Sequence, residues 1–185
     1  MSMKIFMVRH GETDSNAIKR LMGQRCDDTL NDEGRRQAKE LNENIAEMMF
    51  DVVFSSPLKR ASETAEIIAQ KRNLPVILRD ELKERDYGSL SGKTHQEADA
   101  FTKGKWAELR ALDLNQKYDY HPYGGESAED VKERLLKFID EIKREYASKR
   151  VLVVAHAGIL RLSHLLFREV KVSHIDHASI EEFEI

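Results

Sequence analysis

Short apolar runs that end abruptly in charged residues stand out in the hydrophobic pattern of the chain. The first run covers residues 5–8 and is followed by Arg9 and His10, and a second predicted strand, over residues 150–155, is followed by His156. Apolar runs of this length, bounded by turn signals, are typical of strands buried in a parallel sheet. Ligands of open α/β sheets bind just beyond the carboxyl ends of such strands. The pattern therefore places an arginine and two histidines at the mouth of one pocket.

The remaining pattern alternates between strands and helices. Further strands are predicted at residues 51–55, 75–78 and 179–185, the last alternating like an edge strand. Apolar positions three or four residues apart predict helices capped by Asn31, by Ser56 with Pro57 in the first turn, and by Ser127, and another helix over residues 159–167. This order predicts an α/β fold: a three-layer α/β/α sandwich with a mostly parallel central sheet and helices on both faces.

The periodicity of apolar positions weakens in the segment between residues 88 and 126, which is punctuated by several glycines and by Pro122. Only one helical stretch, within residues 96–112, is predicted there. Loops this long usually form lids or binding loops. We therefore expect a single domain over residues 1–185, with a cap segment at about 88–126 inserted beside the pocket.

Composition changes this picture little but excludes some classes of function. The chain has 185 residues, 41% of them hydrophobic and 34% charged, as expected for one ordinary globular domain. Its formal net charge of -3 argues against a nucleic-acid binder, which would usually carry a basic excess. Any attraction for an anion must then come from a local cluster of cations.

The expected cellular compartment of the protein is inferred from features that its sequence lacks. Cys26 is the single cysteine and has no internal disulfide partner, which fits a reducing cytosol. No apolar stretch approaches the roughly 18 residues of a membrane span, and no signal peptide precedes the first strand. We expect a cytoplasmic protein that contacts no membrane. His174 and His177 are three residues apart but lack further metal-ligand spacing, so no metal site is predicted.

The candidate chemistry comes from the strand ends together with Arg60, on the first turn of the helix after the second strand. Two arginines and two histidines would converge there from distant parts of the chain. Arginine's planar fork bonds two phosphate oxygens at once, so the group suits a phosphoryl ligand. A histidine after a buried strand can also be a purely structural, hydrogen-bonded residue. For each histidine taken alone, this structural role is an alternative to a catalytic one.

Five blocks of sequence, in this order, resemble the motifs of the histidine phosphatase (phosphoglycerate mutase-like) superfamily. They are Arg9-His10-Gly11-Glu12-Thr13, Ser56-Pro57-Leu58-Lys59-Arg60-Ala61, Leu82-Lys83-Glu84-Arg85, Gly125-Glu126-Ser127 and His156-Ala157-Gly158. The blocks span essentially the whole chain. A lone Arg-His-Gly would be a weak signal, but the full ordered set is specific.

The resemblance implies a role for each matching residue. His10 would be the nucleophile that forms a phosphohistidine, later hydrolysed by water. Arg9, Arg60 and His156 would hold the phosphoryl oxygens and stabilise the charge that develops during transfer. Neighbouring cations would keep the His10 imidazole unprotonated.

The resemblance also implies an acid/base group and further contacts to the substrate. Glu84 would be the general acid for the leaving oxygen and then the base for the attacking water, although the charged run at residues 79–86 could also be a solvated turn. Asn16 would add a hydrogen bond to the phosphate. Lining residues of the pocket would be Gln24, Tyr87 and Ala157.

Within the superfamily, the chain is more similar to short phosphatases than to mutases. It has Asp86 where cofactor-dependent phosphoglycerate mutases have a histidine, and Ser15 where they have an aromatic residue. The paired arginines that bind the mutase substrate's carboxylate have no clear counterpart between Gly92 and Gly125. We therefore expect a metal-independent phosphatase without a cofactor. The alternatives are a mutase and a catalytically silent phosphate-binding or interaction domain.

The expected partner is a small phosphorylated metabolite, and the sequence does not identify which one. Cap cations could meet a second negative group on it or simply be solvated; they are Lys93, Lys103, Lys105 and Arg110. A monomer and a homodimer both remain open, because an edge strand at residues 179–185 could pair across a two-fold axis but nothing requires it.

Overall fold

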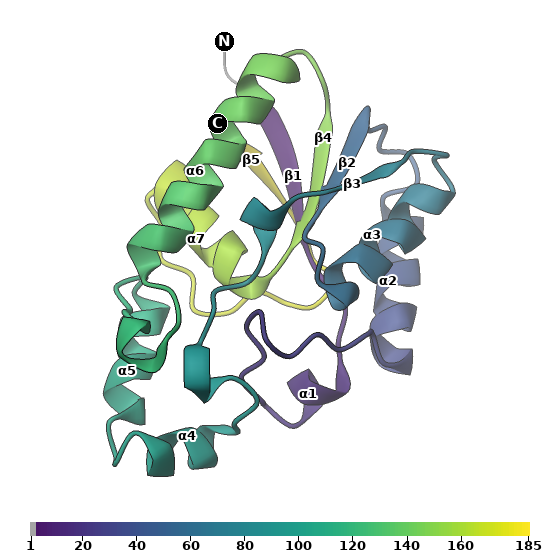
Figure 1. Cartoon of the computed structure of the whole chain (residues 1–185). Helices are drawn as coiled ribbons and strands as arrows, with labels where there is room; N and C mark the ends of the chain where they lie inside the picture. Colours follow the sequence, from purple (N-terminus) through teal and green to yellow (C-terminus); the bar gives the residue numbers. More distant parts are fainter. Residues whose placement is uncertain (1–2) are drawn as a thin grey trace.

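The computed structural model describes residues 3–185 and is built around one five-stranded sheet (Figure 1). The strand order is β3-β2-β4-β1-β5, in which the first four strands run parallel and β5 is antiparallel to β1. The strands are β1 (Lys4–Arg9), β2 (Val52–Ser55), β3 (Val76–Leu78), β4 (Val151–Ala155) and β5 (Ile180–Glu184). The predicted α/β class, the mostly parallel sheet and the edge strand at the C-terminal end of the chain are confirmed, and the antiparallel direction of β5 is a finding of the structure.

Helices cover both faces of this sheet. They are α1 (Asp14–Ala17), α2 (Asp32–Asn44), α3 (Lys59–Gln70), α4 (His95–Phe101), α5 (Trp106–Leu114), α6 (Ala128–Glu145) and α7 (Ala157–Arg168). Short 3-10 turns occur at η1 (Asp80–Leu82), η2 (Gly88–Leu90) and η3 (His121–Tyr123). The cap segment contains α4 and α5, which lie together at one end of the molecule (Figure 1).

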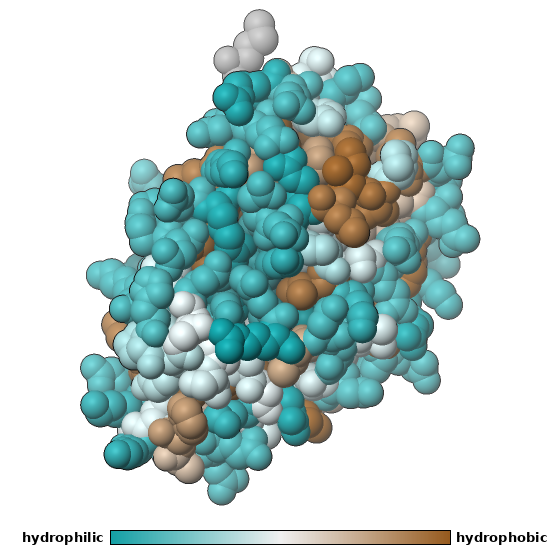
Figure 2. Space-filling model, in the orientation of Figure 1, coloured by the Kyte–Doolittle hydropathy of each residue, from teal (hydrophilic) through white to brown (hydrophobic). Residues whose placement is uncertain are grey.

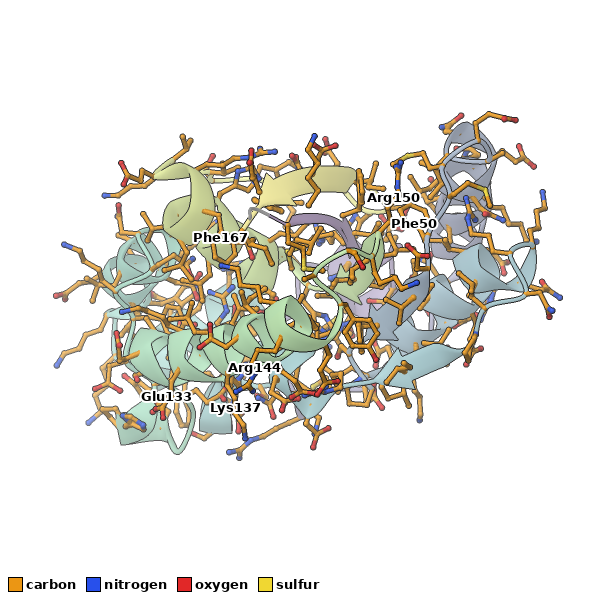
Figure 3. All side chains as sticks on the ribbon, turned by 90° about the horizontal axis from the view of Figure 1, so that it is seen from above. Phe50, Glu133, Lys137, Arg144, Arg150 and Phe167 are labelled. Atoms are coloured by element: carbon orange, nitrogen blue, oxygen red, sulfur yellow. The ribbon has the colours of Figure 1, made fainter. Side chains whose placement is uncertain are left out.

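Alternation along the central strands divides the core into two layers. On β1, Ile5 and Met7 pack with α6, α7 and the cap, whereas Phe6 and Val8 pack with α2 and α3. Successive side chains of a strand point to opposite faces, so a fully apolar strand fills both layers. Near the amino end of the sheet, the Arg150 guanidinium lies 5.2 Å from the centroid of the Phe6 ring, which packs edge-on against Phe50 (Figure 3).

Two of the predicted helix starts are confirmed by their capping bonds. Asn31 accepts a hydrogen bond from the Gly34 N–H (2.8 Å) at the start of α2. Ser127 and Asp130 form a reciprocal capping box at the start of α6. Each cap satisfies backbone donors that have no partner inside the helix.

Other predicted boundaries were wrong for physical reasons. The helix after β2 begins at Lys59 and has Leu58 as its N-cap; the Ser56 hydroxyl accepts from the Leu58 N–H (3.3 Å), before the helix, and lies 2.8 Å from His156 Nε2. The single predicted helix of the cap is two, α4 and α5, separated by Gly104 with φ +83°. This left-handed conformation ends a helix and suits glycine.

The outer surface is largely hydrophilic on the face shown in Figure 2, with apolar side chains gathered near β2 and β3. Among residues 3–185, no helix combines the length and the apolar character needed to span a membrane.

Candidate active site

The parallel pairing of β1 with β4 places the two predicted histidines side by side. Arg9 is in register with Ala155, so His10 and His156 both follow directly after their strands. Their ring centroids are 5.1 Å apart, with the rings inclined at 61°. The two strand ends therefore meet at one place, as expected from the sequence pattern.

His10 is buried and held in one tautomer. Its Nδ1 lies 2.6 Å from the Gly11 carbonyl oxygen, to which the Nδ1–H donates, so Nε2 carries the free lone pair. Burial, together with the charges of Arg60, His156 and Arg9, lowers the pKa of His10 well below its ordinary value. The imidazole is therefore neutral and its Nε2 is available as a nucleophile.

The two arginines are clamped by backbone carbonyls. Arg60, on the first turn of α3, donates to the carbonyl oxygens of Cys26 (3.0 Å) and Gly23 (2.8 Å). Arg9 donates to the Ile175 carbonyl oxygen, and burial lowers the pKa of its guanidinium to about 10. Both side chains remain cationic at neutral pH and are pre-positioned for an anion, because their orientation is fixed before any ligand binds.

His177 belongs to this cluster, although no sequence motif assigned it to the site. Its Nε2 lies 2.7 Å from a terminal nitrogen of Arg9, and its ring centroid is 6.0 Å from that of His10. The pairing of β5 with β1 brings it in, since the Ala178 N–H donates to the His10 carbonyl oxygen. Burial and the charge of Arg9 lower the pKa of His177 to about 4. Its place just before the predicted edge strand was the only available signal.

His156 is completely buried behind His10 and is not among the side chains that line the hollow described below. Its Nε2 lies 2.8 Å from the Ser56 hydroxyl, and its buried Nδ1 has no hydrogen-bond partner within residues 3–185. Burial and the charge of Arg60 lower the pKa of His156 well below its ordinary value, so this ring too is neutral.

Glu84 faces the same hollow with an ionised carboxylate. One of its oxygens accepts from the Arg85 N–H (3.0 Å) and the other from the Gly158 N–H (3.1 Å) at the start of α7. Burial raises the pKa of Glu84, but Arg85 and these two backbone donors outweigh it and hold the pKa at about 2. Gly158 permits the approach, because a Cβ there would lie 2.2 Å from a Glu84 oxygen and 1.8 Å from an Arg85 nitrogen.

A buried ion cluster ties the cap to this carboxylate. Asp113 of α5 forms ion pairs with Arg85 (2.5 Å) and with Arg161 of α7 (2.9 Å), and it accepts a hydrogen bond from the Tyr120 hydroxyl (3.0 Å). Arg85 in turn contacts Glu84 through its Nε (3.3 Å). Sequence reasoning missed Asp113 and Arg161, since nothing in the sequence distinguishes these charges from solvated ones.

These groups surround a hollow of about 160 Å³. Of the predicted site residues, its lining includes Arg9, His10, Asn16, Arg60, Glu84, Tyr87 and Ala157. Gln24 lies elsewhere: its amide nitrogen donates to Glu126 (2.9 Å), and it lines neither this hollow nor the larger one next to it. Asn16 also accepts from the Thr13 N–H (3.2 Å), which fixes the short helix α1 beside the site.

The described part of the chain contains no group of three or more His, Cys, Asp or Glu side chains arranged to hold a metal ion. His174, which was considered as a ligand, instead pairs with Asp176 (2.9 Å) at the surface.

Known proteins are similar in sequence to nearly the whole chain. Residues 5–185 match the histidine phosphatase superfamily (branch 1). The uncharacterized phosphatase PhoE of Bacillus subtilis is 34% identical over 90% of this chain and 76% of its own length. The metal-independent phosphoserine phosphatase of Arabidopsis thaliana is 36% identical over 88% of this chain and 67% of its own.

Solved structures agree with the sequence match. A mycobacterial glucosyl-3-phosphoglycerate phosphatase, determined in complex with VO3, superposes with a TM-score of 0.86 at 29% identity, covering 97% of this chain and 92% of that one. A fold shared at this level, together with the match of residues 5–185, identifies the family. The chain belongs to branch 1 of the histidine phosphatase superfamily.

Proposed function

We propose that the protein is a phosphatase that hydrolyses a small phosphate monoester through a phosphohistidine at His10, without a metal ion. The observation that carries this proposal is the neutral His10 imidazole, with its Nε2 lone pair free, in a hollow that also contains Arg9, Arg60 and the Glu84 carboxylate. A nucleophile, cations for the phosphoryl oxygens and an acid/base group are the parts that phosphoryl transfer requires.

In the first half of the reaction, His10 Nε2 attacks phosphorus while the bond from phosphorus to the ester oxygen breaks. The electron pair of that bond passes to the leaving oxygen, which takes a proton from Glu84. Glu84 is ionised in the free protein, so it must acquire this proton when the ester binds. The negative phosphate raises the pKa of the carboxyl beside it, and an ester monoanion supplies the proton.

In the second half, the ionised Glu84 removes a proton from water, whose oxygen attacks the phosphohistidine. The N–P bond breaks and its electron pair returns to His10 Nε2, which restores the neutral imidazole and releases phosphate. Arg9 and Arg60 stabilise the charge on the travelling phosphoryl group in both halves, because their guanidinium groups are already oriented by the protein.

The test is phosphate release from a panel of sugar, glycolytic and nucleotide esters. We expect the wild type to turn over at least one ester with EDTA present, and His10→Ala to release none above background. His121→Ala, which removes an exposed imidazole on η3, is the matched control and should behave as wild type. Activity that survives in His10→Ala, or that EDTA abolishes, would contradict the proposal.

Mutase activity is the second candidate, because a 2,3-bisphosphoglycerate-dependent phosphoglycerate mutase of Parvibaculum lavamentivorans is 34% identical over 85% of this chain and 76% of its own. Incubation with 3-phosphoglycerate and a 2,3-bisphosphoglycerate primer separates the two. Transfer that outruns phosphate release would identify a mutase. Ester binding with neither reaction would indicate a silent phosphate-binding domain.

A further inference from the structure

A second and larger hollow, of about 410 Å³, opens directly from the catalytic one. A ligand whose phosphoryl group sits at His10 would extend into the second hollow, because the two share five lining residues: Arg9, Asn16, Arg20, Ala157 and Arg161. The remaining lining of the second hollow is rich in cations and imidazoles and includes no carboxylate. The basic groups that line only this hollow are Lys19, His95, Arg110, His174 and His177.

Three of these cations have their charge free for a ligand. Within residues 3–185, the side chains of Lys19, Arg20 and Arg110 take part in no ion pair and no hydrogen bond. This contrasts with Arg161 in the same wall, which is paired with Asp113 (2.9 Å). The protein as a whole is slightly acidic, so this concentration of unpaired positive charge is local.

The three cations are exposed side chains, and the backbone that carries Arg20 is fixed by contacts between the α1 loop and the cap. The Leu21 N–H donates to the Lys93 carbonyl oxygen (2.8 Å), and the Gly92 N–H donates to the Leu21 carbonyl oxygen (2.7 Å). Arg20 forms a β-bridge with Thr94, whose side chain caps α4. The backbone of Arg20 is therefore fixed at the rim, beside the first residues of the cap helix α4, and its exposed side chain extends from this fixed point.

The imidazole between these cations is also oriented. His95 accepts a hydrogen bond at Nδ1 from the Trp106 indole N–H (2.9 Å), which leaves an Nε2–H as donor. Arg110 and Lys19 both act on His95: after burial, their charges are the causes that lower its pKa. Two cations from different segments and a neutral donor thus surround the same space.

We propose that this second hollow binds an additional acidic group of the substrate, a carboxylate or a second phosphate, through Arg20, Arg110 and Lys19. The preferred substrate is then a phosphate monoester with a second negative charge. Of the four cap cations noted in the sequence, only Arg110 lines the hollow; Lys93, for example, stacks on Phe101 (4.7 Å). The inference rests on the proposed phosphatase function and extends it to the substrate class.

The experiment compares kcat/KM for ester pairs that differ by one acidic group. Glycerol 3-phosphate is compared with 3-phosphoglycerate for the carboxylate, and fructose 6-phosphate with fructose 1,6-bisphosphate for the phosphate. We expect the wild type to prefer the more acidic member of at least one pair by tenfold or more. The Arg20→Gln/Arg110→Gln variant should reduce that preference at least tenfold, mainly through KM. Arg144→Gln, which removes an exposed and unpaired arginine of α6, is the control.

Each outcome separates this inference from the function on which it rests. The second anionic subsite would be overturned if the active wild type hydrolysed both members of each pair equally well. It would also be overturned if the preference survived in the double variant. Either result would leave the proposed phosphatase function intact. The pair that shows the preference identifies the group as carboxylate or phosphate. Failure to hydrolyse any ester, including p-nitrophenyl phosphate, would overturn both.

Discussion

At the scale of single residues, the site keeps a buried histidine neutral and a nearby buried carboxylate ionised. Burial beside cations keeps His10 neutral, whereas arginine and two backbone donors keep Glu84 ionised even though it is buried. A nucleophile must be unprotonated and a general base must be ionised, so the free protein holds His10 in the form that the proposed attack on phosphorus requires, and Glu84 in the form that the later activation of water requires. In the proposed reaction, the general-acid form of Glu84 arises only when the phosphate lies beside it.

Glu84→Gln tests this assignment through the leaving group. The amide cannot protonate a leaving oxygen, so we expect kcat for an alkyl phosphate to fall by about 10² to 10⁴. With p-nitrophenyl phosphate as the substrate, the rate constant of the single-turnover burst should fall much less, because p-nitrophenolate leaves without a proton. Glu66→Gln, at an exposed carboxylate on α3, is the control. An equal loss on both esters would show that Glu84 does not act as the acid.

At the scale of elements, the sequence was informative where local signals decide structure. The strand ends that present Arg9, His10 and His156 follow from hydrophobic pattern alone, and the caps at Asn31 and Ser127 from local hydrogen bonding. Ser56 carried the same capping signal, but α3 begins only at Lys59: the Ser56 hydroxyl accepts from the Leu58 N–H, ahead of the first turn, and contacts a histidine 100 residues away.

The part of the site that could not be predicted comes from segments whose position depends on tertiary packing. His177 reaches Arg9 only because β5 adds to the sheet beside β1. Asp113 is significant only because α5 folds over Arg85. Gln24 was assigned by family pattern and bonds to Glu126 outside the hollow. Neither the hydrophobic periodicity of the sequence nor the spacing of its motifs indicates these tertiary contacts.

Asp113→Asn tests the link between cap and site. The change leaves Arg85 and Arg161 without their anionic partner in a buried place, and removing one member of a buried ion pair typically costs about 3 to 5 kcal/mol. We expect the free energy of unfolding, from urea denaturation, to fall by about 3 kcal/mol and kcat/KM to fall with it. Asp99→Asn, at an exposed carboxylate of the cap, should change neither. Wild-type stability in Asp113→Asn would show that the cluster does not stabilise the cap.

At the scale of the whole molecule, burying neutral histidines makes stability depend on pH. An unfolded histidine binds a proton below about pH 6.5, whereas His10, His156 and His177 resist protonation in the folded protein. The unfolded state then binds more protons, so stability is full above pH 6.5 and falls as the pH falls. For His177 this loss runs from about 6.5 down to its folded pKa of about 4. Glu84 adds a separate loss below about pH 4.5 that extends toward its folded pKa of about 2.

His177→Gln isolates one contribution to this dependence. Its amide oxygen can still accept from Arg9 but binds no proton, so we expect the free energy of unfolding to fall less between pH 7 and pH 5 than in the wild type. Urea denaturation at pH 7, 6 and 5 measures the difference. The exposed His121→Gln variant should follow the wild-type curve. An unchanged slope in His177→Gln would mean that this imidazole already titrates normally in the folded protein.

The pairing of β5 with β1 also joins the two ends of the described chain. Met3 and Ile185 exchange two backbone hydrogen bonds (3.0 and 2.8 Å) at the amino end of β1, whereas His10 follows its carboxyl end. A short linker between these residues would close the chain into a ring, which could be reopened at the exposed turn around Asn73. Such a circular permutant would retain the strand ends that are followed by His10 and His156, and a fusion partner attached at residue 3 or 185 would lie at the opposite end of β1 from His10.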